Sequence, residues 1–124
     1  MPELPARVLI RYGDDVTRAL PLDQARLESF AGSVPWRRFR SRKGQLHLSG
    51  RYWSSTMAGH VVYESRLELA RLLLADFDRD VSGIWAQPFR LEATVGGAAH
   101  GHVPDFLLVS TVGVVAVINV ALPA

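Results

Sequence analysis

Two apolar runs near the end of the sequence limit the possible folds most strongly. Residues 103–109 and 114–120 are nearly all apolar, and residues 103–124 together are apolar enough to suggest a membrane span. Polar interruptions at Asp105 and Asn119, with many β-branched residues between them, favour two strands joined by a turn over one lipid-facing helix. Strands this apolar are typical of central positions in a sheet covered on both faces. We therefore expect a sheet that needs other elements to cover it.

One segment supplies a helix for that purpose. Leu67, Ala70, Leu74 and Phe77 recur at spacings of three and four, which predicts a helix over residues 61–76 with this stripe buried. Three further leucines, at positions 69, 72 and 73, widen the predicted buried face. After it, residues 81–86 and 89–95 have the patterns of strands, and two glycines at 96 and 97 predict a turn. The order of elements is a helix followed by a set of strands, as in an α+β fold.

The first third of the chain is less regular. A length of 124 residues favours one domain. Prolines limit regular structure over residues 1–22, and a short helix is expected at residues 23–30 with Asp23 as its N-cap. Short strands are predicted at residues 36–40 and 45–48, joined by a turn at 41–44, with a third strand at 51–57. This organisation predicts an N-terminal segment, residues 1–34, followed by a domain over residues 35–124.

The charge distribution points to one candidate contact with DNA. The net charge is only +2, and Lys43 is the only lysine among 14 basic residues. Five basic side chains are concentrated around the predicted turn at 41–44, where they could contact backbone phosphates. They are Arg37, Arg38, Arg40, Arg42 and Lys43. The alternative is a solvated edge hairpin, whose basic side chains discourage pairing with other sheets.

The absence of cysteine excludes a disulfide framework and a thiolate zinc site, and fits a cytoplasmic protein. His100 and His102, two residues apart, could hold a metal ion, although a polar loop leading into the next strand is the simpler interpretation.

Two carboxylates suggest metal chemistry. Glu68 lies on the predicted helix and Asp105 at the start of a predicted central strand, so packing of that helix on that sheet could bring them together. Hard cations such as Mg²⁺ take oxygen ligands, and phosphodiester hydrolysis uses such an ion to supply hydroxide and polarise the phosphate. The alternative is a solvated helix face on which Glu64, Glu68 and Arg71 form ion pairs.

A wider pattern resembles a known family. Residues 50–54 (GRYWS), 60–70 (HVVYESRLELA), 76–89 (with DFDRDV and QPF) and 104–109 (PDFLLV) resemble, in order and with fitting gaps, the N-terminal nuclease domain of the TnsA-like heteromeric transposase endonucleases. The resemblance covers roughly residues 35 to 120.

The resemblance implies a restriction-endonuclease-like core, with a helix on a mixed sheet. It implies a hydrolase in DNA transposition that cleaves the 5′ strand at transposon ends. The partners implied are transposon-end DNA, a TnsB-like transposase and a TnsC-like ATPase, and the cofactor is Mg²⁺, or alternatively Mn²⁺. The family's metal ligands correspond to Glu68, with Glu64 as a nearby alternative, and to Asp105.

The third motif departs from the family pattern. There the family has a polar residue, a spacer and a lysine. By strand spacing Asn119 takes the polar position and Ala121 the lysine position, whereas alignment on the final Pro-Ala places Leu122 there. Both alignments lose the lysine, and the family continues with another helix and strand, so we expect the domain to be incomplete. Three hypotheses follow: an impaired endonuclease subunit, a non-cutting relative that binds DNA or the transposase, and a truncated remnant.

Overall fold

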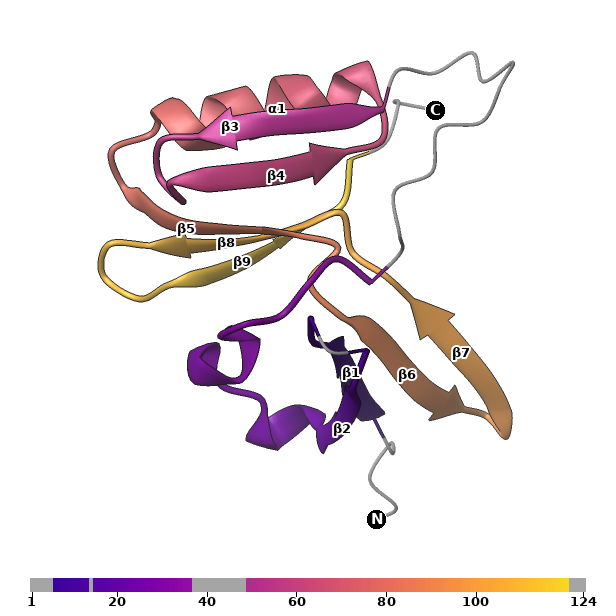
Figure 1. Cartoon of the computed structure of the whole chain (residues 1–124). Helices are drawn as coiled ribbons and strands as arrows, with labels where there is room; N and C mark the ends of the chain where they lie inside the picture. Colours follow the sequence, from indigo (N-terminus) through magenta and orange to yellow (C-terminus); the bar gives the residue numbers. More distant parts are fainter. Residues whose placement is uncertain (1–5, 14, 37–48, 121–124) are drawn as a thin grey trace. The chain divides into compact units, whose positions relative to one another are not determined.

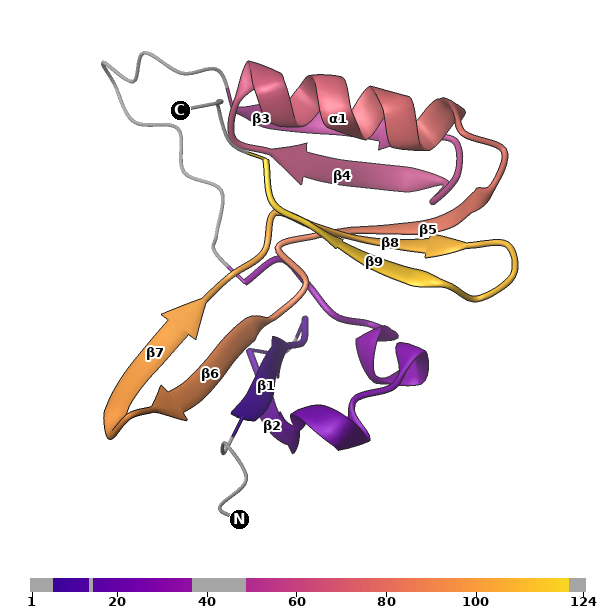
Figure 2. The ribbon, with the colours of Figure 1, turned by 180° about the vertical axis from the view of Figure 1, so that it is seen from behind.

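The computed structural model describes residues 6–13, 15–36 and 49–120 (Figures 1 and 2). Within these ranges the protein is α+β, with one α-helix and three antiparallel sheets. Every strand pairing there is antiparallel, so the parallel pairing that a mixed sheet requires is not found among the described strands. The chain forms two compact units, Met1–Trp36 with Gln87–Pro104 (the sheet unit) and Arg37–Ala86 with Asp105–Ala124 (the helix unit).

The sheet unit is built on a four-stranded sheet in the order β2-β1-β6-β7. Its core includes Val8 and Ile10 of β1, which are almost fully buried, and the rings of Phe30 and Phe89, whose centroids lie 6.0 Å apart. Its elements are β1 (Ala6–Arg11), β2 (Thr17–Pro21), the 3-10 helices η1 (Leu22–Gln24) and η2 (Leu27–Phe30), β6 (Arg90–Val95) and β7 (Ala98–His102).

Two expectations for this unit need correction. The helix expected at residues 23–30 is instead two short 3-10 helices, and Asp23 lies inside the first of them rather than at its N-cap. The loop expected around His100 and His102 is strand β7, which pairs with β6 across the predicted glycine turn. Gly96 and Gly97 both have positive φ, 58° and 82°, which confirms the turn. All residues of β7 are exposed, so its sequence lacks the large apolar residues by which a strand is recognised. The strand was therefore not predicted.

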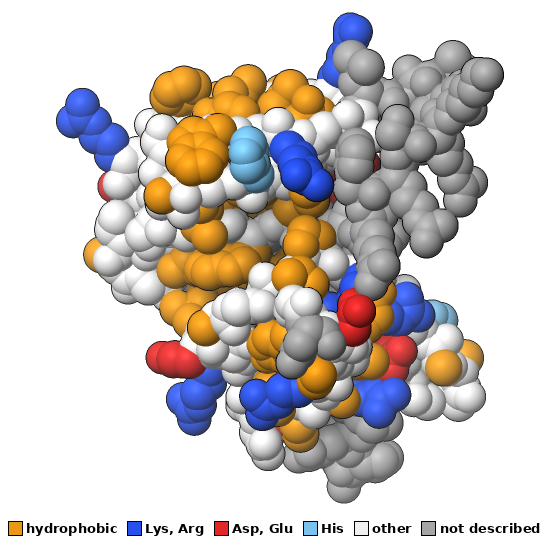
Figure 3. Space-filling model, in the orientation of Figure 1, with side chains coloured by type: hydrophobic (Ala, Val, Ile, Leu, Met, Phe, Trp, Pro, Cys, Tyr) orange, Lys and Arg blue, Asp and Glu red, His pale blue; other side chains and the backbone are white. Residues whose placement is uncertain are grey.

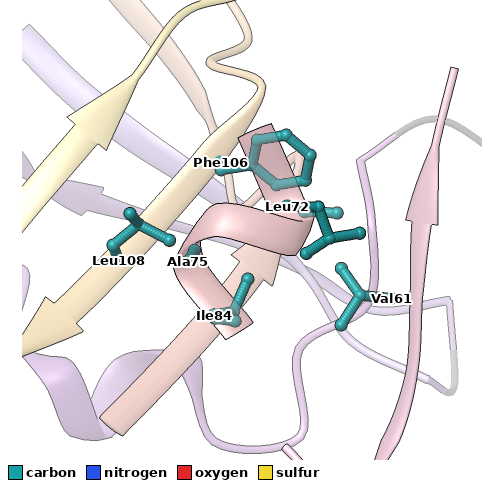
Figure 4. Packing of buried hydrophobic residues seen from close by; sticks show 7 residues of the cluster. Val61, Leu72, Ala75, Ile84, Phe106 and Leu108 are labelled. Atoms are coloured by element: carbon teal, nitrogen blue, oxygen red, sulfur yellow. The ribbon is translucent and has the colours of Figure 1, made fainter. Parts of the chain in front are cut away.

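The helix unit consists of a hairpin, a helix and a three-stranded sheet. The hairpin joins β3 (Gly50–Ser54) to β4 (Gly59–Tyr63), and α1 (Arg66–Phe77) follows it. The sheet has the order β5-β8-β9, formed by β5 (Val81–Ala86), β8 (Phe106–Ser110) and β9 (Val115–Ile118). Figure 4 shows side chains from α1, β4, β5 and β8 meeting in one core. Its buried members are Val61, Leu72, Ala75, Ile84, Ala86, Phe106 and Leu108.

The helix begins later than the hydrophobic spacing predicted. Residues 61–63 belong to strand β4, where Val61 is paired with Tyr52 and Val62 with Arg51. β-Branched and aromatic side chains favour a strand, and this local preference outweighs the helical spacing. Ser65 then caps α1, because its Oγ accepts a hydrogen bond of 3.1 Å from the backbone N–H of Glu68.

The predicted buried stripe was wrong at its four main residues, although Leu72, which was expected to widen it, is buried. Leu72 and Ala75 of α1 point into the core, with 1% and 2% of their surface exposed. Of the predicted stripe, Leu67, Leu74 and Phe77 are 40%, 68% and 78% exposed, and Ala70 is exposed as well. Because α1 is apolar around most of its circumference, spacing alone could not identify the inward face.

The two apolar C-terminal runs do form neighbouring strands, as predicted. Strand β8 is buried along nearly its whole length, whereas the three residues Val115–Val117 of β9 are exposed at the edge of the described sheet. The expectation of a central position is therefore confirmed for β8 and not for β9. Within the described residues, no helix has the length and apolar character that a membrane crossing requires. The strands predicted at residues 36–40 and 45–48 lie, except for Trp36, outside the described residues.

Candidate metal site

Glu68 lies in the first turn of α1, where its carboxylate takes part in capping the helix. Its backbone N–H donates to Ser65 Oγ, and its Oε1 accepts a hydrogen bond of 3.2 Å from the backbone N–H of Glu64. This reciprocal pair resembles a capping box, although the N–H bound is one residue before the N-cap. The side chain is half-buried, so the hydrogen bond from Glu64 holds a carboxylate that is still reachable from solvent.

Asp105 precedes β8 and connects it to the end of β9. Its backbone N–H donates to the carbonyl of Ile118 at 3.1 Å, and its Oδ2 accepts from the backbone N–H of Val120 at 2.6 Å. Asn119 lies between these two contact points and is exposed. The backbone of Asn119 is therefore held beside Asp105.

The strand directions bring Glu68 to the same end of the helix unit. α1 is followed directly by β5, so the last residue of β5, Ala86, lies at the end where α1 begins (Figures 1 and 2). Ala86 is paired with Phe106, and Phe106 with Ile118. Leu72, one helical turn after Glu68, belongs to the same core as Phe106, the residue after Asp105. The N-terminus of α1, the start of β8 and the end of β9 therefore lie at the same end of the helix unit.

The donor set at this end suits a hard divalent cation. Two carboxylates and one amide provide oxygen ligands, which is what Mg²⁺ and Mn²⁺ prefer. Within residues 6–13, 15–36 and 49–120, there is no group of three or more His, Asp or Glu side chains that could hold a metal ion. The candidate centre therefore rests on Glu68, Asp105 and Asn119, and Glu64 does not complete a carboxylate trio with them.

The other predicted site residues lie elsewhere. The basic cluster Arg37, Arg38, Arg40, Arg42 and Lys43, and the lysine position at Ala121 or Leu122, fall outside the described residues. His100 and His102 project from the exposed strand β7 of the sheet unit. Trp53 is 56% exposed on β3 and has an edge-on contact with the His60 ring at 5.3 Å between centroids.

Asp76 is a carboxylate that accepts four hydrogen bonds, and sequence reasoning missed it. Its two oxygens accept from Tyr52 Oη at 2.7 Å, Ser54 Oγ at 2.6 Å, and the backbone N–H groups of Ser55 and Thr56 at 3.3 and 3.0 Å. Burial pushes the pKa of Asp76 upward, but the hydrogen bonds from Ser54, Tyr52 and Thr56 outweigh it and hold this pKa well below its usual range. A signal existed: an acidic residue in the last turn opposes the helix dipole, so it needs partners elsewhere.

A second carboxylate is held between two arginines in the sheet unit. Glu92 on β6 accepts from Arg7 Nη2 at 2.8 Å and from Arg90 Nε at 3.1 Å. These two bonds lower the pKa of Glu92. Gly101 on β7 leaves the space that the Arg90 guanidinium occupies, since a Cβ there would collide with it. The pattern is that of a structural ion network on an exposed sheet face.

Comparison of the chain with models of known protein families, with curated proteins and with solved structures gives no match.

Proposed function

We propose that this chain is a metal-dependent DNA endonuclease domain of the TnsA-like kind, with a restriction-endonuclease-like core and low activity on its own. The proposal is supported by the positions of three elements, because the N-terminus of α1, the start of β8 and the end of β9, which carry Glu68, Asp105 and Asn119, lie at one end of the helix unit. The sequence resemblance supplies the class of substrate, transposon-end DNA, and the class of partners, a TnsB-like transposase and a TnsC-like ATPase.

In this proposal the carboxylates of Glu68 and Asp105 hold one Mg²⁺ ion, and Asn119 adds a neutral oxygen. A bound magnesium ion would polarise the scissile phosphate and lower the pKa of a bound water. The chain's own contribution is orientation. The backbone N–H groups of Glu64 and Val120 each donate a hydrogen bond that holds one of the two carboxylates in place. The basic residues 37–43 would contact the phosphates on either side.

The low activity follows from the residue at the lysine position. Neither Ala121 nor Leu122 carries a charge or a proton donor. Loss of one preorganised electrostatic group commonly costs about 2.7–4 kcal/mol, which corresponds to about 10² to 10³ in rate. DNA binding, which depends on other side chains, is expected to remain.

The test is nicking of supercoiled DNA in Mg²⁺, with and without a co-expressed transposase. We expect slow cutting by the wild-type chain, and faster cutting by Ala121→Lys or, in the other alignment, Leu122→Lys, by about 10² to 10³ with DNA affinity unchanged. Glu68→Gln and Asp105→Asn should abolish cutting. Both keep an oxygen that can accept the backbone hydrogen bond, so the local fold is retained.

Asp78→Asn is the matched control, because Asp78 is an exposed carboxylate that follows the other end of α1. It should cut like the wild type. Cutting that survives Asp105→Asn would refute the proposed site. DNA binding with no cutting by any variant, the lysine variants included, would favour instead a non-cutting subunit that binds DNA or the transposase.

A further inference from the structure

The outer face of α1 carries an unpartnered apolar stripe. Its residues are Leu67, Ala70, Leu74 and Phe77, all exposed, and they lie on the side of the helix opposite the buried Leu72 and Ala75. Figure 3 shows hydrophobic side chains along the upper edge of the molecule, where α1 runs in Figure 1. A helix that is apolar on both faces is normally covered on both, so this stripe is a candidate contact surface.

The stripe is complementary to itself. Its residues are separated by three, four and three positions, so the spacing is the same in either direction. A two-fold axis that pairs two copies of α1 antiparallel brings residue 67 to the level of residue 77, and residue 70 to the level of residue 74. The small Ala70 side chain then faces the large Leu74 side chain of the second copy, a combination that allows close packing.

The charges at the two ends of α1 favour the same arrangement. Arg66 begins the helix and Asp78 follows its last residue, and both side chains are exposed. The axis that pairs residues 67 and 77 also brings Arg66 to the level of Asp78 in the second copy. One opposite-charge pair, Arg66 of one copy and Asp78 of the other, then lies at the same level at each end of the interface, and the two helix dipoles are antiparallel. A parallel pair would instead bring Arg66 beside Arg66.

We propose that the chain forms a two-fold dimer through antiparallel packing of α1 against α1 of a second copy. The occupant of the stripe is therefore another copy of the same chain. Each substitution in such an isologous interface acts twice, once in each copy. Glu68 lies on the side of α1 that faces the sheets, so the candidate metal site is separate from this contact, and the dimer and the nuclease proposal can fail independently.

The first test is the mass of the wild-type chain in solution, measured by analytical ultracentrifugation across the micromolar range. We expect a monomer–dimer equilibrium. Leu74→Glu should raise the dimer Kd by at least about 100-fold, since two buried leucines become two buried charges. Val112→Glu is the matched control, because Val112 is 84% exposed and lies in the β8–β9 turn, away from the stripe. It should leave the Kd unchanged, and circular dichroism should show all variants folded.

The second test uses the charge pair. Arg66→Asp and Asp78→Arg, each alone, bring like charges together twice and should weaken the dimer by about tenfold. An equimolar mixture of these two variants should recover wild-type affinity, because each heterodimer restores two opposite-charge pairs. A purely structural effect of either substitution would not be repaired by mixing. A wild-type chain that stays monomeric, a dimer that survives Leu74→Glu, or no recovery on mixing would overturn the proposal.

Discussion

Substitution of Asp76 by Asn should destabilise the helix unit more than any other single loss of charge among its described residues. Asp76 anchors the end of β3 and the turn that follows it to the last turn of α1, with two hydrogen bonds from β3 and two from the turn. An amide keeps one acceptor oxygen, and its NH₂ group replaces the other. Tyr52 can rotate its hydroxyl to accept from that NH₂, but a backbone N–H cannot adapt. At least one of the N–H groups of Ser55 and Thr56 therefore loses its partner.

The magnitude follows from these bonds. Hydrogen bonds to a charged group contribute about 1.5–3 kcal/mol each, and partial exposure of Asp76 reduces this, so we expect a loss of about 2–3 kcal/mol in the free energy of unfolding. For a chain of this size that corresponds to a fall in Tm of roughly 6–15 °C. Urea denaturation followed by circular dichroism at pH 7 measures the loss directly.

The pH dependence gives an independent check. The folded-state pKa of Asp76 is depressed, so its contribution is fully present above the unfolded-state pKa of about 3.9 and is lost as pH falls below it. The stability difference between wild type and Asp76→Asn should therefore shrink by about 0.7 kcal/mol between pH 7 and pH 3.5. Asp78→Asn is the control. Its side chain keeps an oxygen that can accept the hydrogen bond from the backbone N–H of Asp80, and only the negative charge is lost. A loss below about 0.5 kcal/mol at pH 7 would refute the reasoning.

Two further substitutions test the local structure. Ser65→Ala removes the N-cap acceptor of α1 and should cost about 1 kcal/mol, measured by urea denaturation; an unchanged midpoint would mean that Glu68 alone caps the helix. Gly83→Ala adds a Cβ that would lie 2.5 Å from the Trp85 ring, so the ring must move. We expect a loss of about 1–3 kcal/mol and a shifted tryptophan emission, and wild-type emission would argue against this packing.

The sequence predicted the strands better than the helix. Residues 81–86 and the pair β8–β9 were recognisable because β-branched runs bounded by turn residues have few alternatives. The helix was harder, because α1 is apolar on both faces and its core face cannot be separated from its outer face by spacing. The strand β7 was invisible for the opposite reason: it is short, polar and fully exposed, and only its pairing with β6 makes it a strand.

Only those residues of the candidate site that belong to a sequence motif could be predicted. The Pro-Asp-Phe motif identified Asp105, and its pairing with the segment after β9 follows from strand adjacency. Ser65 and Glu68 have the spacing of a capping box, but the helix was predicted to begin before them, so the cap was not recognised. The partners of Asp76 could not be predicted, since they lie 20 to 24 residues away with no regular period. Long-range pairing such as Arg7 with Glu92, 85 residues apart, is likewise set by tertiary structure.

The most direct test of the proposed metal site is a crystal structure of the chain grown with Mn²⁺, using the anomalous signal of manganese to locate the ion. We expect one peak bonded to both Glu68 and Asp105, with the two carboxylates within roughly 4–6 Å of each other. The Asp105→Asn variant, crystallised in the same way, should lose the peak. A manganese peak that binds neither carboxylate, or carboxylates that lie too far apart to share an ion, would contradict the account.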